Sequence, residues 1–163
     1  KELIIGFDIA GPELNYLPSM YKDSFLKVKN EGINITIHAG EGDGVHSIQE
    51  ALDNGAKRIG HGVRIIEDIN DDNQLGPTAY HVLQNNIPLE VCITSNLHTN
   101  MYKNPQDHPI SRLHNLGFNI SLNTDNRLMS NTSIDNELNV AKAAGIENPT
   151  YLLEYSASDS FLN

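Results

Sequence analysis

The fold class of this chain follows from Ile35-Thr36-Ile37-His38-Ala39-Gly40-Glu41, a strand-like run that ends in a polar cluster. Two later runs have the same form, Arg58-Ile59-Gly60-His61-Gly62 and Ile120-Ser121-Leu122-Asn123-Thr124-Asp125. In a (β/α)₈ barrel the active site lies at the C-terminal ends of the parallel strands, so polar residues distant in sequence converge at one mouth. Two imidazoles and two carboxylates there would suit a metal-activated water. The side chains concerned are His38, Glu41, His61 and Asp125.

Strand-like runs alternate with helical patterns along the chain, which is typical of βαβ units and a parallel sheet. We predict strands at residues 3–9, 33–37, 58–60, 89–93 and 118–122. We predict helices at 19–30, 45–53, 78–85, 109–116, 133–144 and 149–156. Ser19 would cap the first helix and Ser133 the fifth. The polar residues 68–77 are predicted to form an exposed loop.

The chain has 163 residues, whereas a closed (β/α)₈ barrel typically needs about 250. It begins at Lys1 rather than Met and enters a strand-like run almost at once, as an internal fragment would. We therefore predict an α/β fold in which residues 1–163 form the C-terminal part of a single (β/α)₈ TIM-type barrel, incomplete on its N-terminal side.

The bulk composition excludes several classes of partner. A net charge of −10 with scattered Lys and Arg argues against a nucleic-acid partner, because phosphate contacts need clustered cations. A single cysteine, Cys92, excludes an intrachain disulfide framework and a His/Cys/Cys zinc site. No apolar run approaches the roughly 18 residues of a membrane span, and no signal-peptide pattern is visible at the start. We therefore expect a soluble cytoplasmic protein.

Four short motifs follow one another as His-Ala-Gly-Glu (38–41), Gly-His-Gly (60–62), Ser-Asn-Leu-His-Thr (95–99) and Leu-Asn-Thr-Asp (122–125). Together with residues 7–13 and 158–162, this ordered set resembles the adenosine deaminase family, the purine-nucleoside deaminases of the amidohydrolase superfamily. The resemblance covers nearly the whole chain and implies that its strands are the fourth to eighth of the barrel. The family's His-x-His pair does not occur in this sequence, so we expect it upstream.

The resemblance also implies roles for the residues at the mouth. His38 and Asp125 would be ligands of Zn²⁺, and Asp125 would accept a hydrogen bond from the attacking water. Glu41 would protonate purine N1, which requires a carboxyl pKa raised by burial. His61 would orient the water and steady developing charge. The backbone N–H of Gly11 would contact purine N3.

Asn126 departs from the animal form of the motif, in which a second Asp contacts purine N7. Its amide can still donate an N–H to N7. Asp8 would orient its neighbours from behind the ligands, and Glu13 has no clear role. The other histidines are expected to be structural or on the surface, with His98 and His108 placed in loops, and Cys92 is expected to be a small core residue within a strand. These histidines are His46, His81, His98, His108 and His114.

Each proposed site residue also has an alternative interpretation. His38 would simply be satisfied by a loop carbonyl. Asp125 would form an Asx turn. Glu41 would sit in the first turn of the following helix, where the helix dipole favours a carboxylate. His61 would lie in a surface turn between its two glycines.

The combined prediction is zinc-dependent hydrolytic deamination of adenosine and 2′-deoxyadenosine to inosine and 2′-deoxyinosine. This chain would be a fragment of that enzyme and inactive without the missing N-terminal half of the barrel. Two alternatives stay open: a deaminase of adenine or another aminopurine from the same superfamily, and a noncatalytic fragment that serves as an assembly module through its open sheet edge.

Overall fold

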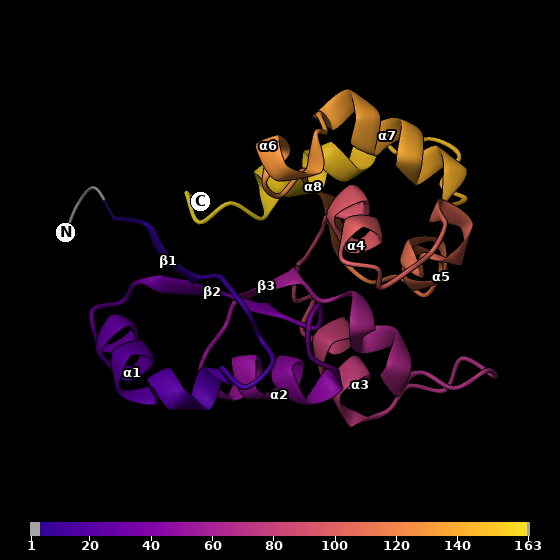
Figure 1. Cartoon of the computed structure of the whole chain (residues 1–163). Coiled ribbons are helices and arrows are strands. Elements are labelled where there is room, and N and C mark those ends of the chain that lie inside the picture. Colours follow the sequence, from indigo (N-terminus) through magenta and orange to yellow (C-terminus); the bar gives the residue numbers. More distant parts are fainter. Residues whose placement is uncertain (1–3, 163) are drawn as a thin grey trace.

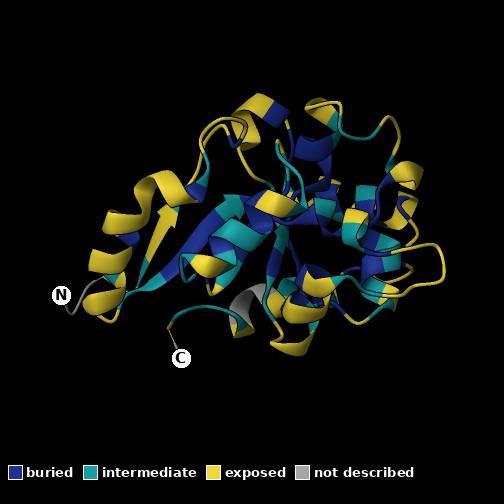
Figure 2. Ribbon diagram, turned by 90° about the horizontal axis from the view of Figure 1, so that it is seen from below, coloured by how far each residue is buried: buried dark blue, intermediate teal, exposed yellow. Residues whose placement is uncertain are grey.

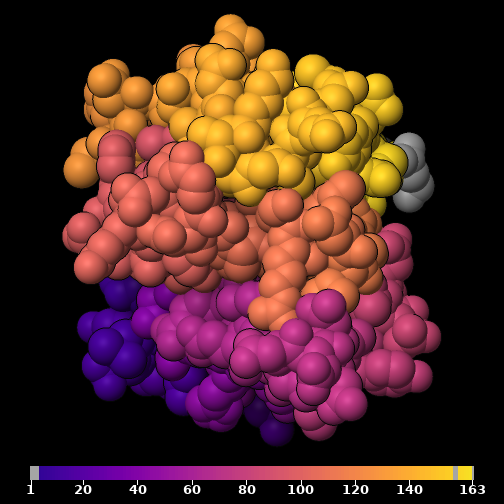
Figure 3. All heavy atoms as spheres, turned by 90° about the vertical axis from the view of Figure 1, so that its right-hand side faces the viewer, coloured from indigo at the N-terminus to yellow at the C-terminus, as the bar shows by residue number. Residues whose placement is uncertain are grey.

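A computed structural model describes residues 4–162, with the side chains of residues 156 and 157 left aside, and places five parallel strands in one sheet. Each strand pairs with the next along the chain, so the sheet order equals the sequence order and the sheet is open. Figure 3 shows the same progression, with the chain advancing in bands across the molecule. The strands are β1 (Gly6–Ile9), β2 (Asn34–Ala39), β3 (Arg58–His61), β4 (Leu89–Val91) and β5 (Ile120–Leu122).

Helices connect and cover these strands. In Figure 1, α1, α2 and α3 run along one side of β1–β3, and α4 to α8 gather at the other end of the molecule. The α-helices are α1 (Lys22–Asn30), α2 (Val45–Asp53), α3 (Pro77–Gln84), α4 (Ile93–His98), α5 (Ile110–Asn115), α6 (Arg127–Ser130), α7 (Ile134–Ala143) and α8 (Tyr151–Ser158). The 3₁₀ helices are η1 (Pro18–Tyr21), η2 (Val63–Asp68) and η3 (Pro105–Asp107).

The two faces of the sheet differ in character because side chains alternate along a strand. One face is aliphatic and packs beneath the helices, which gives the buried strands at the centre of Figure 2. The other face carries polar groups, and the register places His38 opposite Gly60 and Thr36 opposite Arg58. The aliphatic face consists of Ile35, Ile37, Ile59, Leu89, Val91, Ile120 and Leu122, each no more than 2% exposed.

The C-terminal segment crosses the polar face near the beginning of the strands. Arg58 forms an ion pair with Glu90, at 3.0 Å between Nε and Oε1. Its guanidinium also lies 4.5 Å from the ring centroid of Phe161 and donates a hydrogen bond to the backbone oxygen of Asp159. A cation over an aromatic ring is favourable, so Arg58 holds the Ser-Phe-Leu segment against the sheet.

The alternation of strands and helices is confirmed, but the strands predicted at 3–9, 89–93 and 118–122 extend beyond those observed, and the second of them overlaps a helix. The prediction extended this strand to Ile93 and left residues 95–99 in a loop, whereas the strand ends at Val91 and α4 occupies Ile93–His98. The carboxylate of Glu137, on α7, accepts the N–H of Thr94 in the first turn of α4. A distant partner thus stabilises a helix start that local propensity does not favour.

Smaller differences concern caps and short helices. Cys92 is the buried residue preceding α4 rather than part of a strand. Ser19 does not cap α1: residue Tyr21 precedes that helix, and the N–H of Ser19 donates to Glu50. Ser133 caps α7 as predicted, accepting from the N–H of Asn136. Helix α6 was not predicted. The predicted first strand included Leu3, which with Lys1 lies outside the described residues.

None of the helices within residues 4–162 combines the length and apolar character that crossing a bilayer requires.

Candidate active site

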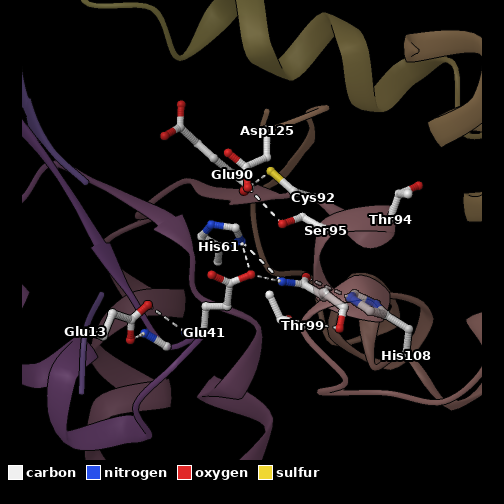
Figure 4. Close-up of polar contacts among 12 residues, drawn as sticks. Glu13, Glu41, His61, Glu90, Cys92, Thr94, Ser95, Thr99, His108 and Asp125 are labelled. Carbon is white, nitrogen blue, oxygen red and sulfur yellow. Dashed lines mark hydrogen bonds and ion pairs between the residues drawn. The ribbon is translucent and has the colours of Figure 1, made fainter. Parts of the chain in front are cut away.

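The C-terminal ends of the strands gather four of the predicted residues at one mouth. His38 is the second-last residue of β2, and His61 is the last residue of β3. Glu41 follows β2, and Asp125 follows β5. Figure 4 shows Glu41, His61 and Asp125 arranged about a common centre, with Ser95 of α4 beside them. The ring centroids of His38 and His61 are 5.1 Å apart. Residues up to 87 positions apart in sequence therefore share one site, because parallel strands present their C-terminal ends at the same edge.

His61 is buried in this cluster and is not a surface turn residue. Its side chain is 2% exposed, and its backbone φ of 62° is unusual for a residue with a side chain. Burial and the neighbouring His38 lower the pKa of His61 to about 4. The ring is therefore neutral at pH 7, with one nitrogen that donates and one that accepts hydrogen bonds.

The carboxyl of Glu41 lies next to His61. Oε1 of Glu41 is 3.5 Å from Nδ1 of His61 and accepts a hydrogen bond of 2.9 Å from Nδ2 of Asn96. Burial raises the pKa of Glu41, as a proton donor near neutral pH requires. Helix α2 begins only at Val45 and has no acidic residue in its first turn, so the first-turn interpretation of Glu41 is wrong.

Glu13 anchors the loop that carries Glu41, a role that the sequence did not reveal. Its buried carboxylate accepts backbone N–H bonds from Gly40, Glu41 and Asp43 at 2.8, 2.9 and 3.0 Å. It also accepts the hydroxyl of Ser47 at 3.1 Å. Three backbone donors converging on one carboxylate hold the loop in a single conformation. The available signal was the acidic residue that ends the motif at 7–13.

Asp125 is positioned by helix α4. Its Oδ2 accepts a hydrogen bond of 2.8 Å from the hydroxyl of Ser95. Its φ of 53° is left-handed, a conformation that Asp tolerates better than most residues. The negative charge of Asp125 raises the pKa of both His38 and His61, although burial dominates at His61. The negative charge of Asp125 therefore acts on both histidines of the mouth.

Two buried residues outside the predicted set complete the polar cluster. Asn96 of α4 is 0% exposed and contacts both Glu41 and His61. His108 is 3% exposed, and its Nε2 lies 3.2 Å from Oδ1 of Asn96. Asn96 belongs to the Ser-Asn-Leu-His-Thr motif, whose His98 was predicted to lie in a loop. His98 is instead an exposed residue at the end of α4.

The predicted substrate contacts lie on either side of this cluster. Gly11, with a φ of 137°, lines a cavity of about 240 Å³ together with His38, Ile9 and Pro12. No described atom lies within 4 Å of a Cβ built at Gly11, so its backbone is open to a ligand. Asn126 precedes α6, and its side-chain oxygen accepts the N–H of Met129. Its amide N–H₂ group is therefore left to donate to a substrate.

The residues present fit part of a zinc site. Nδ1 of His38 is buried without a hydrogen bond in the described structure, with Oδ1 of Asp8 3.6 Å away. The carboxylate of Asp8 raises the pKa of His38, partly offset by burial. Imidazole and carboxylate are usual zinc ligands. Within residues 4–162 no group of three or more His, Cys, Asp or Glu side chains could hold a metal ion, so a complete site needs further ligands.

Comparisons with known proteins show which family and which solved structures the chain is similar to. Residues 1–150 match the family model "Adenosine deaminase". Adenosine deaminase 1 of Streptomyces coelicolor is 48% identical over 139 residues, which make up 82% of this chain and 35% of that protein. Adenine deaminase from Arthrobacter aurescens superposes with a TM-score of 0.86 at 24% identity, covering 98% of this chain and 48% of that chain. An amidohydrolase from Burkholderia ambifaria, solved with bound Zn, gives a TM-score of 0.85 at 18% identity, covering 100% of this chain and 45% of that chain.

The two solved structures establish the fold, and the sequence matches establish the family. This chain spans less than half the length of each of these proteins. Its open five-stranded sheet is therefore part of a (β/α)₈-type barrel, as predicted. On the match of 150 residues to the family model and the 48% identity to a curated relative, the chain belongs to the adenosine deaminase family.

Proposed function

We propose that this chain is the C-terminal part of a zinc-dependent hydrolase that converts adenosine and 2′-deoxyadenosine to inosine and 2′-deoxyinosine. Water would replace the amino group at C6, and ammonia would leave. The observation that carries the proposal is the pairing of Glu41 with neutral His61 beside the cavity lined by His38 and Gly11. A partly buried acid and a neutral imidazole next to an open cavity suit hydrolysis of a bound ring.

Glu41 would supply the proton that activates the purine. Protonation of N1 makes C6 electrophilic, and burial raises the pKa of Glu41, which favours the protonated carboxyl that this step needs. The hydrogen bonds of Glu13 to the loop hold this carboxyl in place. After water has added to C6, one of its protons would pass to the departing amino group, which leaves as ammonia, and the carboxylate of Glu41 would take up the other as C6 becomes a carbonyl.

His61 and Asp125 would handle the attacking water. His61 would hold it by a hydrogen bond, and Asp125 would accept a hydrogen bond from it. His38 and Asp125 would be two of the ligands of a zinc ion, which when bound lowers the pKa of water toward about 7. The remaining ligands would come from a His-x-His pair in an N-terminal segment that precedes residue 1.

Substrate orientation would depend on two groups. The backbone N–H of Gly11 would contact N3 of the purine at the cavity, and the amide N–H₂ group of Asn126 would donate to N7. The described residues that line this cavity include no cluster of cationic side chains to bind a phosphate group, which suits a nucleoside. The enzyme would work in the cytoplasm, where a free thiol such as that of Cys92 stays reduced.

The proposal is tested by comparing two proteins: residues 1–163 alone, and the product of the complete reading frame. We expect the longer protein to bind zinc stoichiometrically and release ammonia from adenosine and deoxyadenosine, and residues 1–163 to do neither. Preference for adenine would favour a base deaminase instead. Turnover of no aminopurine by the zinc-loaded longer protein would refute the enzyme assignment and favour an assembly module.

A further inference from the structure

Asn96 and His108 form a buried chain of hydrogen bonds that ends on both proposed acid-base groups. Nε2 of His108 is 3.2 Å from Oδ1 of Asn96. Nδ2 of Asn96 is 2.9 Å from Oε1 of Glu41 and 3.2 Å from Nδ1 of His61. Figure 4 shows dashed lines that lead from His108 toward the pair formed by Glu41 and His61. Neither Asn96 nor His108 lines the cavity that contains Gly11.

The contacts of His108 fix which of its ring nitrogens carries the proton. Nδ1 of His108 accepts the backbone N–H of Ile110 at 3.2 Å, so it is not protonated. In a neutral ring the proton is then on Nε2, and burial keeps the ring neutral by lowering its pKa to about 3. Tyr102 packs edge-on against the ring, with centroids 4.9 Å apart, which limits its rotation.

The orientation of the Asn96 amide follows from His108. Because Nε2 of His108 donates, the atom of Asn96 that faces it must be the carbonyl oxygen. The NH₂ group of Asn96 therefore points toward the mouth, with one N–H directed at Glu41 and the other at His61. Asn96 is 0% exposed, so water does not compete for these bonds, and a flipped amide would leave buried groups unsatisfied.

The same logic reaches the imidazole of His61. If Nδ1 of His61 carried a proton, two donors would face each other at 3.2 Å. Nδ1 must therefore accept from Asn96, and the proton of the neutral ring lies on Nε2. We infer that Asn96 and His108 are positioning residues that hold His61 in its Nε2–H tautomer and the carboxyl of Glu41 in one orientation. The tautomer assignment stands on this geometry alone, and its catalytic consequence rests on the proposed function.

The consequence is that His61 presents its Nε2–H as a donor at the mouth, and that Asn96 and His108 set the direction of this donor. His61 offers an N–H rather than a bare nitrogen to the water beside it, while Oε1 of Glu41 is held by Asn96, which leaves Oε2 available for a proton. Partners that orient a site residue from behind commonly contribute about 10- to 100-fold to metal affinity or activity.

The test uses the zinc-loaded protein from the complete reading frame, labelled with ¹⁵N-histidine. Long-range ¹H–¹⁵N spectra distinguish a protonated ring nitrogen from a bare one, and the signals of His61 are identified by their loss in His61→Asn. We expect the proton on Nε2 in the unaltered protein. In Asn96→Asp, which has the same shape but presents only acceptors to His61, we expect the proton on Nδ1 and kcat lowered about 10- to 100-fold, with KM little changed.

A second pair of variants tests the far end of the chain of hydrogen bonds. His108→Phe removes the donor to Asn96 and should give a mixed tautomer signal and a loss of kcat. His108→Gln retains an N–H₂ donor and should restore the Nε2–H signal. His114→Phe is the matched control: it breaks the 2.6 Å contact with the hydroxyl of Tyr151, away from the mouth, and should lower only the melting temperature.

Two results would overturn the inference. One is a proton on Nδ1 of His61 in the unaltered protein. The other is an unchanged tautomer in both Asn96→Asp and His108→Phe with a lowered melting temperature, which would make these residues purely structural. An Nε2–H signal in a protein that turns over no purine would instead leave the positioning assignment standing and refute the proposed function.

Discussion

Gly60 lies directly opposite His38 across the β2–β3 pair, and a Cβ atom at Gly60 would be 2.7 Å from Nδ1 of His38. That distance is shorter than the contacts that Cβ atoms make with atoms to which they are not bonded. The imidazole of His38 thus occupies the space that a side chain at position 60 would take. The glycine of the Gly-His-Gly motif is required by its neighbour on the adjacent strand, and the motif's histidine and the histidine of His-Ala-Gly-Glu are coupled through it.

Gly60→Ala should displace the imidazole of His38. We expect unfolding free energy to fall by about 1–3 kcal/mol, as for overpacked cores, and zinc affinity of the complete protein to fall with it. Calorimetric zinc titration and urea unfolding measure both. Gly42→Ala is the control, because a Cβ there would lie 3.7 Å from its nearest neighbour, an ordinary contact. Equal zinc affinity in the two variants would contradict the steric argument.

Glu41→Gln should abolish most turnover, by about 10²- to 10⁴-fold, because Gln cannot donate a carboxyl proton. In the unaltered enzyme, activity should decline as pH rises through the raised pKa of Glu41. Stability should change in the same direction: burial penalises the ionised form, so the contribution of Glu41 to stability is greatest below the unfolded pKa and is lost as pH rises through the folded one. At neutral pH the variant should therefore unfold no more easily than the parent, as chemical denaturation would show.

Glu13→Gln should loosen the loop that carries Glu41. An amide retains one oxygen acceptor where the carboxylate serves three backbone N–H groups and a hydroxyl. We expect a loss of about 1–3 kcal/mol in stability, faster hydrogen exchange at Gly40 and Asp43, and reduced kcat. The control is Glu50→Gln, since Glu50 accepts a backbone N–H from Ser19 on an exposed part of the surface. Unchanged exchange rates in Glu13→Gln would remove Glu13 from this role.

The protein should lose stability on mild acidification because of its buried neutral histidines. Burial lowers the pKa of His108 from 6.5 to about 3 and that of His61 to about 4. The contribution of these two histidines to stability is complete above the unfolded pKa and falls as pH drops below 6.5, since they take up protons there only in the unfolded chain. His108→Gln should lose less stability than the parent between about pH 7 and about pH 5 in urea unfolding. The exposed His81→Gln should match the parent; an equal loss in His108→Gln would contradict this origin.

Most of the mouth could be predicted from local sequence. His38, His61 and Asp125 each follow a short apolar run, and parallel strands bring such positions together whatever the intervening loops do. Most of the longer helices were also predicted from their sequence patterns. One example is α7, which Ser133 caps. The prediction failed where a long-range contact decides the local structure. Ile93 reads as the end of a strand, yet Glu137, 43 residues away, accepts the N–H of Thr94 and supports a helix there.

The polar support of the site shows the same limit. Asn96 and His108 carry no spacing that marks them, because their importance comes from burial and from the direction of their donors and acceptors. Glu13 is likewise an ordinary acidic residue until three N–H groups 27 to 30 positions away meet it.

The order of motifs and the periodicity of apolar residues were enough to predict the family, the parallel sheet and the edge at which the candidate site lies, because those depend on the chain's local pattern and on how parallel strands must align. Which nitrogen of His61 bears a proton, which way the amide of Asn96 points, and why residue 60 has no side chain depended on the packed structure. Those properties arise from distances between side chains on different strands and helices, which no single segment contains.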